Sequence, residues 1–207
     1  LSASRSGGSW SSSNTSIATV SNTGVVTAIS AGAASIVYHH TWGACDEDAT
    51  YGIIVHPRPT VSITGATTIC QGLTTSLSPS TGGTWASSNP AVATVTNTGV
   101  VTGVSPGTAT FTFTNSSTTC PSNATAPVTI LGLPAISYSG SSTLCIGGTT
   151  TLSPTSGGTW LSTNPTVASI TNQGVVTALS AGNSTFRFTN SSTGCVSNDS
   201  GILIVNP

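Results

Sequence analysis

Charge is what this sequence has least of. Only 3% of its 207 residues are charged, it contains no lysine, and its formal net charge is −1. Nucleic acids and anionic membrane surfaces are bound through clusters of basic side chains, so we expect neither as a partner. No apolar run approaches the roughly 18 residues that a membrane-spanning helix needs, so we also expect no membrane insertion.

The residues that usually carry catalysis and metal binding are scarce as well. No Gly-x-Ser-x-Gly elbow occurs, and the few histidines and carboxylates form no triad pattern, so we expect neither an enzyme nor a cofactor. The carboxylates lack the glycine-spaced loop of a calcium site, and adjacent histidines on a strand point to opposite faces, so no metal site is assigned. These residues cluster near the start of the chain and are His39, His40, Asp46, Glu47, Asp48 and His56.

What the sequence does have is a repeat of 75 residues. A Gly-Gly-x-Trp motif occurs three times, and its tryptophans are Trp10, Trp85 and Trp160. A fixed period indicates one structural unit copied in tandem, and this length suits a small domain. We predict repeat 1 at 1–59, which is N-terminally incomplete, repeat 2 at 60–134 and repeat 3 at 135–207. We expect the three tryptophans, early in a central strand, to anchor the cores.

Each repeat carries the signals of short β-strands. Thr, Val, Ile and Ser dominate and alternate, and Phe111 and Phe113 fall on one face of the run from Thr108 to Thr114. Arg187 stands between two phenylalanines and should therefore point outward. Asn and Gly mark tight turns between the runs, and no segment shows a helical period. About seven short strands per repeat predict an all-β fold of tandem sandwiches.

The repeated motifs resemble a known family. Gly-Gly-Thr-Trp-Ala-Ser-Ser-Asn-Pro-Ala-Val-Ala at 82–93 and Gly-Val-Val-Thr-Gly-Val-Ser-Pro-Gly-Thr-Ala at 99–109 are similar to the bacterial immunoglobulin-like group 2 domain. The Cys-x-Gly segment before the second strand further resembles repeats of long secreted surface adhesins of gliding bacteria. The resemblance covers the whole chain and implies immunoglobulin-like sandwiches in a stalk or adhesive module. It implies no catalytic residues, and the fold alone names no ligand.

Five cysteines follow the repeat period in two series, Cys70 with Cys145, and Cys45 with Cys120 and Cys195. Two cysteines per complete repeat in a secreted chain indicate disulfides, and no repeat has four ligands at zinc spacing. Proximity in sequence slightly favours pairing within each repeat, Cys70–Cys120 and Cys145–Cys195, with the partner of Cys45 outside the chain. An immunoglobulin-like topology puts the first turn and the last hairpin at opposite poles, which favours Cys70–Cys195 between neighbouring repeats. Both alternatives stay open here.

Six Asn-x-Ser/Thr triplets are candidate glycosylation sites, although such triplets also arise by chance in a sequence rich in Ser, Thr and Asn. Asn115 and Asn190 recur at the same hairpin, where a sugar would project into solvent. An undecorated loop is the preferred alternative, and sugars linked to Ser or Thr are a further one. The remaining candidates are Asn14, Asn123, Asn183 and Asn198.

Repeat 1 is cut short relative to the other two. Leu1 aligns with Leu77 and Leu152, so the first strand and much of the second have no counterpart before it. Either the sequence is a window on a longer array, or a partner chain supplies the missing strand by β-augmentation. The first reading is preferred, and the missing signal peptide agrees with it.

Together these features predict a non-catalytic, structural repeat array of an extracellular bacterial surface fibre, filament or adhesin stalk, secreted or at the cell surface. Long edge strands with few charges pair with other chains, so the expected partners are other copies or adjacent repeats of a longer chain. The alternative is an adhesion module that recognises a surface glycan or a protein of a host or neighbouring cell through exposed loops, foremost residues 39–50. A carrier array attached to a distant enzyme is the third alternative.

Overall fold

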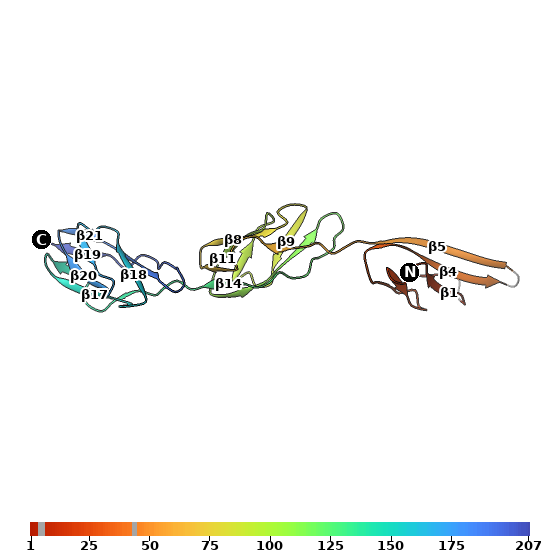
Figure 1. The fold of residues 1–207 in the computed structure, drawn as a ribbon, viewed down its shortest axis with the longest axis horizontal. Coiled ribbons are helices and arrows are strands. Elements are labelled where there is room, and N and C mark those ends of the chain that lie inside the picture. The colour runs from red at the N-terminus through yellow and green to blue at the C-terminus, as the bar shows by residue number, and fades with distance from the viewer. Residues whose placement is uncertain (4–6, 43–44) are drawn as a thin grey trace. The chain divides into compact units, whose positions relative to one another are not determined.

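The computed structural model describes residues 1–3, 7–42 and 45–207, and the side chains of Trp42 and Cys45 lie outside that description. All the regular secondary structure in these ranges is β-strand (Figure 1), which confirms the predicted all-β class. No helix in the described residues could therefore cross a membrane. The names repeat 1, repeat 2 and repeat 3 keep the bounds given above, which remain a prediction.

The chain forms two compact units. The first comprises Leu1–Val61, Thr81–Thr84 and Thr112–Ala124, and so contains repeat 1 and the last hairpin of repeat 2. The second comprises Ser62–Ser80, Trp85–Phe111 and Thr125–Pro207, and so contains most of repeat 2 and all of repeat 3.

Repeat 3 is a sandwich of two layers. One layer is a sheet in the order β15-β17-β20-β19, and the other contains the sheet β16-β23-β21 and the pair β18-β22. The strands are β15 (Ser137–Tyr138), β16 (Thr143–Cys145), β17 (Thr149–Ser153), β18 (Gly158–Ser162), β19 (Ala168–Ile170), β20 (Val175–Ala178), β21 (Gly182–Ser184), β22 (Phe186–Asn190) and β23 (Leu203–Asn206).

One apolar core lies between these layers. Phe186 and Phe188 share a face of β22, because alternate residues of a strand do so, and both are almost inaccessible to solvent. Trp160 on β18 packs its ring 5.1 Å from that of Phe188, centroid to centroid. Arg187 between them is half exposed, as the alternation predicts. The other buried core residues are Leu152, Val167, Ala168, Val176, Ala178, Leu203 and Val205.

Repeat 2 has the same topology, with sheets in the orders β10-β11-β8-β6 and β12-β14-β7 and the pair β13-β9. In both repeats the last strand runs antiparallel to one neighbour and parallel to the other, so β14 pairs with β7 as β23 pairs with β16. The strands are β6 (Ser62–Ile63), β7 (Thr68–Cys70), β8 (Thr74–Ser78), β9 (Gly83–Ser87), β10 (Ala93–Val95), β11 (Val100–Gly103), β12 (Gly107–Ala109), β13 (Phe111–Asn115) and β14 (Val128–Leu131).

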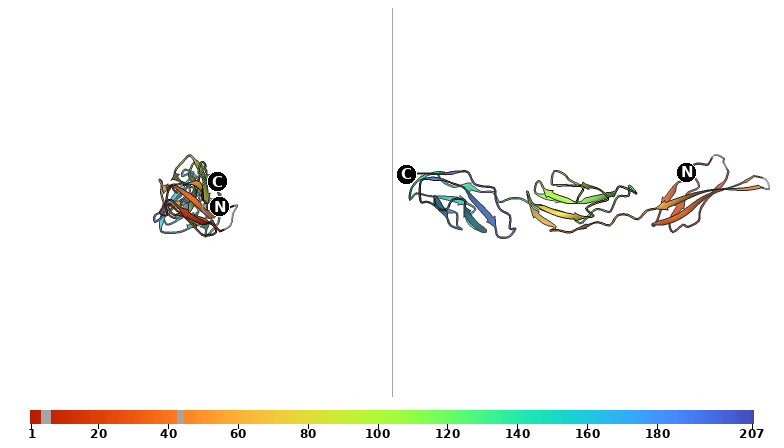
Figure 2. Two further views of the ribbon diagram at one scale, coloured as in Figure 1. Left: turned by 90° about the vertical axis from the view of Figure 1, so that its right-hand side faces the viewer. Right: turned by 90° about the horizontal axis from the view of Figure 1, so that it is seen from above.

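Repeat 1 has a three-stranded sheet β1-β4-β5 and a two-stranded sheet β2-β3. Its strands β4 and β5 form an unbroken antiparallel ladder from the pair Gly32–Val55 to the pair Trp42–Cys45. In Figures 1 and 2 they are the two long orange strands that lie side by side. The strands are β1 (Ser9–Ser12), β2 (Ala18–Val20), β3 (Val26–Ala28), β4 (Gly32–Trp42) and β5 (Cys45–Val55).

The turn predicted at Asn97-Thr98-Gly99 shows why glycine recurs there. Gly99 has a φ of +80°, in the left-handed region that side chains disfavour. Its carbonyl accepts the N–H of Leu77 at 2.8 Å, and a Cβ on Gly99 would lie 2.5 Å from the carbonyl oxygen of Leu77. Both the conformation and the close approach of β8 therefore require glycine at this point.

Candidate functional site

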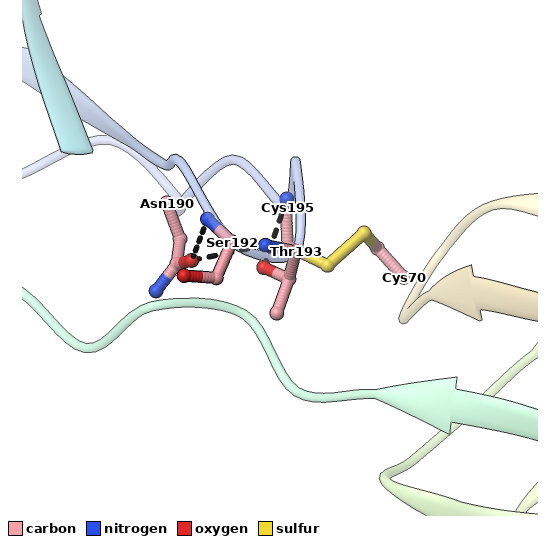
Figure 3. The surroundings of a disulfide bond; sticks show 5 residues. All are labelled: Cys70, Asn190, Ser192, Thr193 and Cys195. Atoms are coloured by element: carbon pink, nitrogen blue, oxygen red, sulfur yellow. Dashed lines mark hydrogen bonds between the residues drawn. A yellow bond between two sulfur atoms is a disulfide. The ribbon is translucent and has the colours of Figure 1, made fainter. Parts of the chain in front are cut away.

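The structure joins Cys70 of repeat 2 to Cys195 of repeat 3 through a disulfide (Figure 3). The two Cα atoms are 5.6 Å apart, which is a usual separation for a bridged pair. Both residues are buried, with exposed fractions of 8% and 1%. The bond therefore links two neighbouring repeats covalently, in addition to the short joint Gly132-Leu133-Pro134 between them.

The pairing within each repeat, which proximity in sequence favours, is therefore wrong for Cys70 and Cys195. Cys70 ends β7, and the parallel pairing of β7 with β14 sets it beside Leu131, the last residue of β14. Cys70 thus lies where the chain leaves repeat 2 for repeat 3. The topology of the strands, and not separation along the chain, decides which cysteines meet.

Asn190 holds the hairpin that presents Cys195. Its Oδ1 accepts hydrogen bonds from the backbone N–H groups of Ser192 and Thr193 at 2.9 and 3.1 Å (Figure 3). Thr193 Oγ1 in turn accepts the N–H of Cys195 at 3.2 Å. Asn side chains commonly fix tight loops in this way. Here Asn190 fixes the loop that presents Cys195.

Cys120 lies in the same hairpin one repeat earlier. Oδ1 of Asn115 accepts two loop N–H groups at 2.9 and 3.1 Å, and the N–H of Asn115 donates to the carbonyl of Cys120 at 3.1 Å. Cys120 is half-buried and Cys145 is exposed, and both are free thiols. Cys45 begins β5, and its side chain lies outside the described residues.

The three tryptophans differ in burial. Trp85 and Trp160 are 6% and 7% exposed, and the indole Nε1 of each donates to a proline carbonyl, Pro79 and Pro154, at 2.9 Å. Trp10 is only half-buried, with its ring centroid 4.8 Å from that of Tyr38. Two of the three predicted anchors thus lie in closed cores, and the third borders an open one.

Five of the six glycosylation candidates lie in loops or at strand ends, and Asn183 is the middle residue of β21. Asn115 and Asn190 are half-buried and use their Oδ1 atoms to fix the cysteine hairpins. The other four are exposed: Asn14, Asn123, Asn183 and Asn198. Oδ1 of Asn14 accepts from Ser16, and Oδ1 of Asn123 accepts from Arg58 at 3.3 Å. Glycosylation at all six stays a prediction.

Repeat 1 contains a hollow of about 610 Å³, here called the aromatic hollow. Concave sites with apolar walls and a few polar groups are the usual form of small-ligand sites. Rings and hydrogen-bonding groups both line this one, so it could hold a ligand with apolar faces and hydroxyl groups. Its main lining residues are Trp10, Tyr38, His40, Glu47, Asp48 and Tyr51.

Beside the aromatic hollow, the strand pairing of repeat 1 differs from that of repeats 2 and 3. Sequence reasoning missed this difference. In repeat 3 the hydroxyl of Ser197 accepts the N–H of Phe188 at 2.9 Å, and Ser122 does the same for Phe113 in repeat 2. These hydroxyls take the place of backbone acceptors, and the segments that carry them form only isolated bridges, Thr114–Pro121 and Thr189–Val196, and no regular strand. Glu47 occupies the same position in repeat 1, where the regular ladder continues through its pairing with His40. The serine two residues after the cysteine was the available signal.

The charged groups form exposed pairs. His39 Nδ1 contacts Asp48 Oδ1 across the β4-β5 ladder, and this hydrogen bond with the carboxylate raises the pKa of His39. The guanidinium of Arg187 donates to both oxygens of Asp199, which lowers the pKa of that carboxyl and raises the pKa of Arg187. Partial burial raises the pKa of Tyr138, whose hydroxyl donates to the carbonyl of Gly201 at 3.0 Å.

No three His, Cys, Asp or Glu side chains gather in a metal-binding arrangement in the parts of the chain that the structure describes. The pairing of His39 with Asp48 is a side-chain contact between two strands, and Asp46 and Glu47 lie exposed on the same strand as Asp48. Of the charged and histidine side chains in this region, His40, Glu47 and Asp48 line the aromatic hollow and give it its polar side.

Several solved structures can be aligned with this chain. Invasin, a bacterial integrin-binding protein, aligns at a TM-score of 0.41 with 15% identity over 98% of this chain and 52% of its own. Domains 4–9 of the surface layer protein SbsC align at 0.27 with 15% identity over 96% of this chain and 38% of their own. Mouse protocadherin-24 EC1-3 aligns at 0.24 with 13% identity over 96% of this chain and 89% of its own. We draw no functional conclusion from these likenesses.

The chain spans about half or less of the length of the surface layer and invasin structures that it matches. No curated protein sequence matches it significantly. The sequence profile of the bacterial Ig-like domain (group 2) matches three successive segments, residues 2–38, 49–125 and 135–197. These segments cover most of the chain, and the second begins on β5 of repeat 1 and ends within repeat 2. The protein therefore belongs to the bacterial Ig-like domain (group 2) family.

Proposed function

We propose that this chain is a structural, non-catalytic part of an extracellular bacterial surface fibre, filament or adhesin stalk. The observation that carries the proposal is the disulfide between Cys70 and Cys195, which fastens one repeat to the next. A covalent link of this kind strengthens the connection between neighbouring repeats and has no catalytic role. Disulfides also persist in oxidising surroundings, which supports a location outside the cytoplasm.

The surface of the strands supports assembly with other copies. Ile54 on β5 and Leu161 on β18 are exposed by 71% and 66%, and charges that would repel a neighbouring strand are few. Exposed apolar strands with few charges are the kind that pair laterally with other chains. The partners we propose are therefore other copies of this protein or adjacent repeats of a longer chain.

Imaging tests this proposal. Antibody against repeat 3, followed by gold labelling and electron microscopy, should mark extended surface structures on intact, unreduced cells. Labelling that needs permeabilised cells would contradict the surface location. Purified material imaged without reductant should show regular filaments or rods, whereas isolated globular particles at all concentrations would contradict the structural role.

The second candidate is an adhesion module, and the aromatic hollow of repeat 1 favours it. Tyr51 lies in this hollow and Ile54 lies on the opposite face of the same strand, because residues an odd number apart face opposite ways. On a panel of immobilised oligosaccharides, Tyr51→Ala should lose any binding that the unaltered chain shows. Ile54→Ala is the matched control and should keep it; equal loss in both variants would exclude the hollow.

A further inference from the structure

Strand β5 has an open edge along residues 46–51. Among the described strands, β5 pairs with β4 alone, and the ladder between the two strands is unbroken. Every residue from Asp46 to Tyr51 is exposed. The edge of a regular strand carries a row of backbone N–H and C=O groups with which another strand can pair.

This open edge is a consequence of the regular ladder in repeat 1. In repeats 2 and 3 the stretches that correspond to 46–51 are 121–126 and 196–201, and they form isolated bridges and no strand. There β7 and β16 pair with residues 129–131 and 204–206, beyond these stretches. In all three repeats, therefore, no described strand lies on the outer side of the corresponding stretch, and only repeat 1 gives that stretch the form of a strand.

The backbone groups of β5 alternate in direction. Both backbone groups of Ser35 on β4 face the side of β1, since its carbonyl accepts the N–H of Ser13 at 2.9 Å and its N–H donates to Ser13 Oγ at 2.9 Å. Ser35 is paired with Gly52 in the ladder between β4 and β5. In an antiparallel pair, a residue whose groups face away from its partner leaves the groups of that partner facing away as well. The N–H and C=O groups of Gly52, and of every second residue before it, therefore face the open edge.

Acidic side chains stand along this edge. The residues whose backbone groups face outward are Thr50, Asp48 and Asp46, and Glu47 lies between the two aspartates. Three of the four Asp and Glu residues of the sequence are thus consecutive here. His39 contacts Asp48, but both side chains remain about half exposed. A strand added at this edge would bring its own side chains next to these carboxylates.

A second copy of this chain is a poor match for the edge. Two β5 strands side by side would set acidic residues against acidic residues, and like charges directly opposite each other are destabilising. The sequence contains no lysine and only three widely separated arginines. His56 and Arg58 are the one pair of basic residues two positions apart, and the prolines on both sides of Arg58 have no N–H to donate. The matching occupant is therefore a different protein.

We propose that the edge of β5 at residues 46–51 binds an extended, basic segment of another protein as an added strand. Backbone hydrogen bonds to Asp46, Asp48 and Thr50 hold the segment. Lys or Arg side chains at every second position lie beside the two aspartates, because alternate residues of a strand share a face. Backbone pairing supplies the affinity, and the acidic residues select a basic segment over a neutral or acidic one. The inference goes beyond the proposed array and does not depend on the chain being part of a fibre.

The test uses the 207-residue chain and the peptide acetyl-Thr-Arg-Val-Arg-Val-Arg-Thr-amide in excess at low salt. Nuclear magnetic resonance measures hydrogen exchange at each backbone amide. Exchange should slow at Asp46, Asp48 and Thr50, whose N–H groups gain partners, and should change little at Glu47 and Ala49, whose N–H groups already face β4. Equal slowing at all five amides, or no slowing in excess peptide, would overturn the added strand.

Two altered peptides separate backbone pairing from charge. Methylation of the backbone nitrogen of each arginine keeps the positive charges and removes the N–H donors, so this peptide should bind at least about tenfold more weakly. The peptide with glutamate in place of every arginine should not bind, because its charges repel those of the edge. Equal affinity of the methylated and unmethylated peptides would contradict the proposal, since attraction between charges would then explain the binding.

Substitutions in the chain locate the site. The double variant Asp46→Asn with Asp48→Asn keeps the backbone edge and removes two charges, so it should bind the arginine peptide about tenfold more weakly at low salt. The difference should shrink at high salt, which screens exposed charges. Asp199→Asn removes an exposed carboxylate of repeat 3 and is the matched control, which should bind as the unaltered chain does. Equal weakening in both variants would refute a site at β5.

Discussion

Repeats 1 and 3 share a sequence pattern, but the core that this pattern builds is closed in repeat 3 and open in repeat 1. In repeat 3, Trp160 and Phe188 lie in a core covered on both sides. In repeat 1 the equivalent Trp10 and Tyr38 are half-buried and border the aromatic hollow. The periodic residues therefore give each repeat its strands, whereas closure depends on further segments that cover the strand edges.

The two tryptophans give the largest expected contrast. Trp160→Ala should lower the free energy of unfolding by about 3–5 kcal/mol, because a large buried side chain leaves a cavity. Trp10→Ala should cost clearly less, since much of that ring is already in contact with water. Urea unfolding followed by circular dichroism measures both. Equal losses would show that repeat 1 is as closed as repeat 3.

The hairpin cysteines give the next contrast. Cys195→Ser removes the disulfide and should destabilise the protein by about 2–4 kcal/mol under oxidising conditions. Cys120→Ser changes the same hairpin one repeat earlier, where the thiol is free, and should leave stability nearly unchanged. Denaturation with and without reductant checks this, because only the difference caused by Cys195→Ser should vanish on reduction.

A smaller contrast concerns the side-chain hydroxyls that accept backbone N–H groups in place of the carbonyls of a paired strand. Ser200 Oγ accepts the N–H of the fully buried Phe186 at 3.0 Å, so Ser200→Ala should cost about 1–3 kcal/mol by leaving that N–H unpaired. Thr50 occupies the same position in repeat 1, on the regular and exposed β5 strand. Thermal melting of Thr50→Ala should therefore match the unaltered chain. A loss as large as that of Ser200→Ala would contradict the regular ladder.

The smallest contrast is in the response to pH. The raised pKa of His39 means that its pair with Asp48 stabilises the folded state below the ordinary histidine pKa of about 6.5 and that this is lost as pH rises through the folded value. The lowered pKa of Asp199 gives the opposite sign, since its contribution is present above about 3.9 and is lost as pH falls through the folded value.

Nuclear magnetic resonance titration of His39 and Asp199 measures both shifts directly. Because both pairs are exposed, the accompanying changes in melting temperature should be small. Asp48→Asn should return the pKa of His39 toward its ordinary value without affecting Asp199. A pKa of His39 that does not respond to this substitution would exclude the pairing.

The alternation and turn residues were enough to predict the class of fold. Phe186 and Phe188 fall on one buried face with Arg187 outward, and glycine at 99 takes the left-handed conformation that the turn needs. These features depend only on neighbours along the chain, whose geometry the strand period sets. The predicted Thr108 to Thr114 strand is nevertheless broken at Thr110, which pairs with Ser88 instead.

The disulfide and the aromatic hollow depend on contacts between distant segments, and there the sequence was less informative. Cys70 meets Cys195 across 125 residues because the parallel pairing of β7 with β14 sets Cys70 at the end of its repeat. Where repeat 3 has Ser197, whose hydroxyl accepts a backbone N–H outside any strand, repeat 1 has Glu47 within an unbroken ladder. Neither outcome can be read from residue spacing alone.

The bond between Cys70 and Cys195 also decides which part of the chain would bear a pulling force. Residues 71–194 form a closed covalent loop, so tension applied to the two ends of repeats 2 and 3 passes through the sulfur atoms and bypasses this loop. At about 3.5 Å for each extended residue, the 125 intervening links would lengthen the chain by about 430 Å if the loop were opened. Even with both repeats unfolded, an oxidised chain would keep that length out of reach, and only reduction would release it.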